Sequence, residues 1–128
     1  MKRRDFLYKV IFLISVVTIV SGAGQVIRPG VVLGLISGES TPTTRHFFGI
    51  VGMFMVLFGG AMVHALLSPR DHPVVVLWAG LQKLGAFVAV GLAVWRGLLS
   101  ALALGVAGFD LMSGFLFLWY WLTIRRTP

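Results

Sequence analysis

Apolar positions along the chain form four long blocks separated by short polar stretches. The blocks cover residues 6–27, 46–67, 73–95 and 99–124. Each has the length of about 20 residues that a helix needs to cross the hydrocarbon core of a bilayer. Backbone groups find no water there, so each block is predicted to be a helix. The pattern predicts an all-α integral membrane bundle of four transmembrane helices, forming one domain over residues 1–128.

The connections between these blocks differ in length. Two prolines in "SPRDHP" end the second predicted helix and start the third. Arg96–Gly97 predicts a tight hairpin between the third and fourth helices. Residues 28–45 form the one long loop. Its apolar segment Val31–Ile36 is too short to span a membrane, so we expect it to lie at the interface or to dip into the bundle. The "SGESTPTT" that follows is typical of an exposed turn region.

Composition agrees with a membrane protein and narrows the chemistry. Apolar residues make up 58% of the chain and charged residues 12%, against about 25% charged in soluble domains. The chain has no cysteine, which removes disulfides and thiolate metal sites. The net charge of +7 comes from basic residues that flank apolar blocks, as topology determinants do. The predicted partner is therefore the lipid bilayer, with no nucleic acid.

The distribution of lysine and arginine predicts the orientation. Basic residues accumulate on the cytoplasmic side of membrane proteins, and placing the N-terminus inside puts more of them there. We therefore expect both termini on the inner side. The inner side would hold Lys2, Arg3, Arg4, Lys9, Arg70, Arg125 and Arg126, and the outer side would hold Arg28, Arg45 and Arg96.

The N-terminal "RRDFL" also matches the core of a twin-arginine export signal. A cleaved signal would leave three spans. However, no soluble domain follows, and no clear cleavage site appears near Ser21–Gln25. We therefore interpret these basic residues as holding the N-terminus inside.

Two opposite charges stand within the predicted third and fourth helices. Lys83 lies ten residues into its block and Asp110 eleven residues into its own. At about 1.5 Å per residue, both reach roughly 15 Å, near the middle of the membrane. The short hairpin makes these helices antiparallel neighbours. We therefore predict a buried Lys83–Asp110 pair.

Small residues share the helix faces of both charges, at the spacings that let helices approach closely. An unpaired charge at this depth costs about 2.5–3.5 kcal/mol, which a pair would offset. The pair could line a path for a proton or substrate, or it could be a structural pair that fixes helix register. The sequence leaves both interpretations open.

Other polar residues are weaker candidates. Gly49, Gly60 and His64 fall on one arc of the second helix, so His64 is predicted to face a packed surface, where it either bonds a neighbouring helix or joins a proton relay. Arg28 and Arg45 lie at the predicted outer mouth, where they either anchor the spans or attract an anionic group. No set of metal or haem ligands is visible, so we expect no metal and no cofactor.

Three segments, Thr44–Leu67, Trp78–Val90 and Gly108–Leu122, resemble small uncharacterised bacterial four-helix membrane proteins and are loosely similar to the DoxX family. The resemblance lies in their order: a glycine-rich helix opening with arginine and aromatics, a helix with a central lysine, and an aspartate before an aromatic-rich tail. It implies a four-helix fold in a bacterial inner membrane and little about chemistry.

The sequence is consistent with two functions. The first is a non-enzymatic accessory or oligomeric subunit, because no catalytic constellation is visible. The second is a proton-coupled transporter or carrier of a small solute or lipid, using Lys83, Asp110 and His64. The first predicts association with itself or with a larger membrane complex.

Overall fold

The protein is all-helical over residues 6–125, the part of the chain that the computed structural model describes. Its elements are α1 (Phe6–Ile27), α2 (Pro29–Leu35), α3 (Pro42–Leu67), α4 (Pro73–Trp95) and α5 (Ala103–Ile124). All except α2 are long and apolar enough to cross a membrane. The predicted four-helix class is confirmed, and the bounds of α1 and α4 agree with the first and third apolar blocks.

Helix α3 begins at Pro42, four residues before the predicted start at His46. The reason is local. Thr41 Oγ1 accepts a hydrogen bond from the Thr44 backbone N–H, and Thr44 Oγ1 accepts one from the Thr41 backbone N–H. This capping box and a proline at the first helical position define a helix start. Part of the predicted turn region "SGESTPTT" is therefore the first turn of α3.

Helix α5 begins at Ala103, four residues after the predicted start at Leu99. The connection from α4 is consequently longer than the predicted two-residue hairpin. Its turn does lie at Gly97, which has a φ of 75°. The Leu98 N–H donates to the Ala93 carbonyl at 2.8 Å and the Gly97 N–H to the Val94 carbonyl at 3.0 Å. These two bonds form a Schellman motif, which ends α4.

The four long helices form two antiparallel hairpins, α1 with α3 and α4 with α5. Glycines bring the backbones close in both. A Cβ added at Gly52 of α3 would lie 2.6 Å from the Gly22 carbonyl oxygen of α1. A Cβ added at Gly114 of α5 would lie 2.6 Å from the Leu84 side chain of α4. Such small-residue contacts permit close helix packing in membranes.

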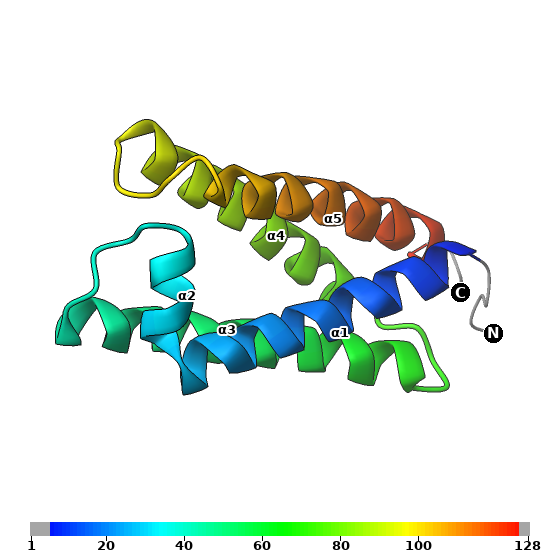
Figure 1. Ribbon diagram of the computed structural model, residues 1–128. Helices are drawn as coiled ribbons and strands as arrows, with labels where there is room; N and C mark the ends of the chain where they lie inside the picture. The colour runs from blue at the N-terminus through cyan, green and yellow to red at the C-terminus, as the bar shows by residue number, and fades with distance from the viewer. Residues whose placement is uncertain (1–5, 126–128) are drawn as a thin grey trace.

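The hairpins converge at the end where α1 begins and α5 finishes, and they diverge toward α2 (Figure 1). Tyr8 and Tyr120 meet edge to face at the convergent end, with ring centroids 6.5 Å apart. The Tyr8 hydroxyl also donates to the Leu66 carbonyl at 2.6 Å. The buried core occupies this half of the bundle and consists of Tyr8, Ile11, Ile14, Met62, Leu66, Val76, Ala79, Phe117, Tyr120 and Ile124.

Helix α2 lies at the divergent end (Figure 1). It packs on α1 and α3, with Leu33 buried, so the apolar segment of the long loop folds onto the bundle. The Ser100 N–H of the α4–α5 connection donates to the Ile36 carbonyl at 2.8 Å. This bond joins the two hairpins at the end where their helices separate.

Candidate functional site

A cavity of about 590 Å³ lies between the two hairpins, in the half of the bundle toward α2. The core fills the other half, so the cavity is closed toward the convergent end. All five helices contribute to its walls, which are mainly apolar. The lining residues are Val17, Thr18, Ser21, Gly24, Gln25, Val32, Ile36, Phe48, Val51, Met55, Gln82, Lys83, Ala86, Val90, Leu99, Ala103, Gly105, Val106, Phe109 and Asp110.

Lys83 and Asp110 line this cavity together. The structure places Lys83 Nζ 3.6 Å from Asp110 Oδ1, and their side chains are 5% and 11% exposed. Both residues therefore occur where the sequence predicts them, on adjacent antiparallel helices. The separation exceeds the 2.7–3.2 Å of a well-formed N–H···O hydrogen bond. The charges are paired, but both ends keep hydrogen-bonding capacity.

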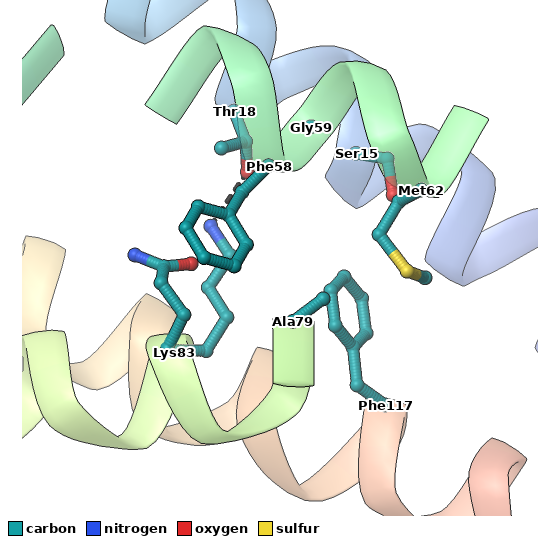
Figure 2. A pocket seen from close by; sticks show the side chains of 9 residues that line it. Ser15, Thr18, Phe58, Gly59, Met62, Ala79, Lys83 and Phe117 are labelled. Atoms are coloured by element: carbon teal, nitrogen blue, oxygen red, sulfur yellow. Dashed lines mark hydrogen bonds between the residues drawn. The ribbon is translucent and has the colours of Figure 1, made fainter. Parts of the chain in front are cut away.

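Thr18 of α1 is a third member of this site. Lys83 Nζ donates to Thr18 Oγ1 at 2.6 Å, and the Thr18 hydroxyl donates to the Ile14 carbonyl at 2.9 Å. Figure 2 shows Lys83 extending from α4 toward Thr18 across the gap between the hairpins. The Phe109 ring centroid lies 5.4 Å from Lys83 Nζ, within range of a cation–π contact. The lysine thus connects both hairpins.

The sequence reasoning missed Thr18, although a signal exists. Ser15, Thr18, Gly22 and Gln25 follow one another at spacings of three and four residues and are all buried. This stripe of small and polar residues marks the face of α1 that packs against other helices. Because it lies within a strongly apolar block, overall hydropathy conceals it.

A second, much smaller cavity adjoins the same lysine. It has a volume of about 10 Å³, close to the minimum for one water molecule. Ser15, Thr18, Phe58, Met62 and Phe117 are among the side chains around it (Figure 2).

Gln82 lines both cavities. Its Oε1 is buried, and no hydrogen-bond partner for it occurs among the described residues. Gln82 precedes Lys83 in α4, and both residues border the same space.

His64 does not join this group. It is exposed in the last turns of α3 and lines neither cavity. The prediction that it faces a packed surface is therefore wrong. Glycines occur on more than one side of α3: Gly52 and Gly59 contact α1, whereas a Cβ added at Gly60 would meet nothing within 4 Å. A Cβ added at Gly49 would lie 3.8 Å from the Gln25 carbonyl oxygen of α1, so the predicted arc combines one glycine that contacts α1 with one that does not.

The two predicted outer-mouth arginines also lie apart from the main cavity. Arg28 is exposed immediately before α2. Arg45 donates from Nη1 to the Ser40 carbonyl at 3.2 Å and to Ser40 Oγ at 3.1 Å. Arg45 lines a separate pocket together with residues of α1. The Arg45 contacts stabilise the loop before α3, and neither arginine lines the cavity that holds Lys83.

Chemically, the site combines a neutral ion pair with apolar walls. Lys83 and Asp110 carry no net charge together, whether both are ionised or a proton has passed from one to the other. Among residues 6–125, no three His, Cys, Asp or Glu side chains come close enough to hold a metal ion. The arrangement can hold a molecule whose polar end meets the pair and whose apolar body follows the walls.

Comparison of the chain with models of protein families, with curated proteins and with solved structures finds no match. The class therefore follows from the structure itself. Four helices long and apolar enough to span a bilayer make this a multi-pass membrane protein. Four basic residues that the orientation prediction counts on the inner side lie outside the described residues: Lys2, Arg3, Arg4 and Arg126. The twin-arginine pair is among them.

Proposed function

We propose that the protein is a non-enzymatic membrane carrier that binds a small amphipathic molecule between its two hairpins. The observation that carries the proposal is the cavity of about 590 Å³ ending at Lys83 and Asp110. Ligand pockets in proteins have volumes of about 300–1,000 Å³, with apolar walls and a few placed polar groups. Intramembrane charges also tend to mark substrate pathways.

The polarity of the cavity indicates how the molecule would lie. The charged pair and Thr18 gather at one place, whereas Val17, Val51 and Val90 belong to the apolar walls. A polar head would therefore meet the pair, and an apolar body would extend along the diverging helices. At about 30 Å³ per water-sized atom, the cavity accommodates on the order of 20 non-hydrogen atoms.

The cavity supports a carrier better than an accessory or oligomeric subunit. A purely register-fixing pair needs only tight packing around it, but Lys83 and Asp110 border an open volume. A lipid or other molecule dissolved in the bilayer fits better than a water-soluble solute, because the walls are apolar. The proton relay is not part of this proposal, since His64 lies elsewhere. Association with other copies stays a prediction of the subunit interpretation.

Location and orientation also belong to this proposal. We place the protein in a bacterial inner membrane with its N-terminus inside, on the strength of the DoxX-like resemblance and the basic residues. Lys9 and Arg125 lie near the convergent end, and Arg28, Arg45 and Arg96 near the divergent end. In this orientation the cavity occupies the outer half of the membrane.

A filled-cavity variant tests the carrier. Gly24 lines the cavity, and a Cβ added there would meet nothing within 4 Å. Gly24→Leu therefore introduces a side chain into the space without a backbone clash. Gly60→Leu is the matched control, because Gly60 also has free space at its Cβ and does not line the cavity. Each protein would be placed in phosphatidylcholine nanodiscs containing hexadecanol and examined by native mass spectrometry.

We expect one hexadecanol per chain to stay bound to the unmodified protein and to Gly60→Leu. Gly24→Leu should lose this adduct, with circular dichroism confirming that its helices remain. Equal retention by all three proteins, or no adduct with any of them, would reject the cavity as a binding site.

A further inference from the structure

Lys83 and Asp110 form the closed end of the cavity, called its floor below, and they limit the head group that the cavity accepts. Resting on the proposed carrier function, we infer that the ligand is an uncharged amphipathic molecule whose head carries a hydroxyl group, which accepts a hydrogen bond from Lys83 and donates one to Asp110.

The charge balance of the pair favours a neutral head group. Lys83 and Asp110 together are neutral, and both are more than nine-tenths buried, with residue exposures of 4% and 8%. An anionic head placed against the pair would meet the Asp110 carboxylate, and a cationic head would meet the Lys83 ammonium. Like charges a few ångströms apart repel strongly where the effective dielectric constant is low. A neutral head avoids both repulsions.

The hydrogen-bonding groups of the pair favour a hydroxyl group. A lysine ammonium has three donors and no acceptor, and an ionised carboxylate has only acceptors. One Lys83 donor goes to Thr18 Oγ1 at 2.6 Å. The 3.6 Å from Nζ to Asp110 Oδ1 is too long for a good hydrogen bond. The site therefore presents both a donor and acceptors, and a hydroxyl satisfies both kinds at once.

The residue before Lys83 in α4 carries a buried acceptor without a partner in residues 6–125. Gln82 lines the same cavity, and its buried Oε1 has no hydrogen-bond partner among the described residues. A buried acceptor without a partner is unfavourable. Asp110, which lines the same cavity, adds carboxylate oxygens that only accept hydrogen bonds. A head that donates is therefore preferred to one that only accepts, such as an ether.

The experiment measures competition among ligands with the same hydrocarbon chain. The unmodified protein, in phosphatidylcholine nanodiscs containing deuterated hexadecanol, is challenged with hexadecanol, hexadecanoate, hexadecylammonium or hexadecyl methyl ether. Native mass spectrometry reports how much deuterated adduct each competitor displaces. We expect hexadecanol to compete at least about tenfold better than each of the other three, which corresponds to about 1.4 kcal/mol.

Charge variants then test the assignment to the two side chains. Asp110→Asn leaves Lys83 as the charge at the floor, so competition by hexadecanoate should increase about tenfold relative to hexadecanol. Lys83→Gln leaves Asp110, so hexadecylammonium should gain instead. Folding of each variant is checked by circular dichroism. If a variant does not fold, the selectivity of the unmodified protein decides the inference by itself.

The possible failures are distinguishable. If the charged competitors or the ether displace the adduct as well as hexadecanol does, the head-group inference is wrong and the carrier proposal stands. If no hexadecanol adduct forms, or if Gly24→Leu retains it, the carrier proposal itself fails.

Discussion

Replacing either Lys83 or Asp110 alone should destabilise the protein far more than replacing both together. Lys83→Met leaves a carboxylate whose side chain is 11% exposed, and Asp110→Leu leaves an ammonium whose side chain is 5% exposed. Removing one partner of a buried pair costs about 3–5 kcal/mol because the other charge is left uncompensated. We expect each single variant to lose stability in this range.

The double variant Lys83→Met with Asp110→Leu leaves no buried charge. Apolar replacements of a buried pair are often neutral or stabilising. Here Thr18 loses only an incoming hydrogen bond, because its own hydroxyl still donates to the Ile14 carbonyl at 2.9 Å. We therefore expect the double variant to lie within about 1–2 kcal/mol of the unmodified protein, with a coupling energy of several kcal/mol between the two sites.

The assay is reversible unfolding in mixed micelles of dodecyl sulfate and a non-ionic detergent, followed by circular dichroism at helical wavelengths. A double-mutant cycle isolates the pairwise energy. If the two single losses simply add in the double variant, the pair is not an energetic unit and the reasoning is refuted. A double variant that is stable yet binds no hexadecanol would assign the charges to ligand binding as well as to folding.

Four further substitutions test the packing around the site, each by the same unfolding assay. Gly52→Ala should cost about 1–3 kcal/mol of stability, because its Cβ would lie 2.6 Å from the Gly22 carbonyl oxygen. Gly60→Ala should instead stabilise the protein by up to about 1 kcal/mol through helix propensity. Equal effects of these two substitutions would contradict the α1–α3 packing. Thr18→Val should cost about 1.5–3 kcal/mol of stability in the unmodified protein, as expected for a hydrogen bond to a charged group. The cost should be much smaller in the Lys83→Met variant. An equal cost in both backgrounds would show that Lys83 is not the partner of Thr18. Tyr8→Phe should cost about 1 kcal/mol by removing the 2.6 Å bond to the Leu66 carbonyl, and no loss would show that this bond adds nothing to stability.

Hydropathy and helix geometry predict most of this fold. Four apolar blocks gave the four long helices, and the midpoint positions of Lys83 and Asp110 gave their pairing. The turn at Gly97 was also predicted. Two helix starts were misplaced, because a helix start depends on local hydrogen bonds such as the Thr41–Thr44 capping box, which hydropathy does not record.

The cavity and its third polar member could not be predicted in the same way. Apolar residues that face lipid, a neighbouring helix or an internal space look alike in sequence, so Val51 and Val90 gave no sign of lining a cavity. The prediction that His64 faces a packed surface failed for a related reason. Helix α3 has glycines on more than one side, and only some of them contact α1. The divergence of the two hairpins depends on how four helices pack together, and no single block encodes it.

The most direct test of the carrier is the position at which a bound amphipathic molecule contacts the chain. A hexadecanol bearing a photoactivatable diazirine would be crosslinked to the protein in phosphatidylcholine nanodiscs, and the modified peptides would be mapped by mass spectrometry. We predict labelling of the cavity-lining stretches at residues 82–90 and 103–110, suppressed by unlabelled hexadecanol and by Gly24→Leu. Labelling confined to exposed positions such as Phe54, Trp78 and Phe115, with no suppression, would contradict a binding site between the hairpins.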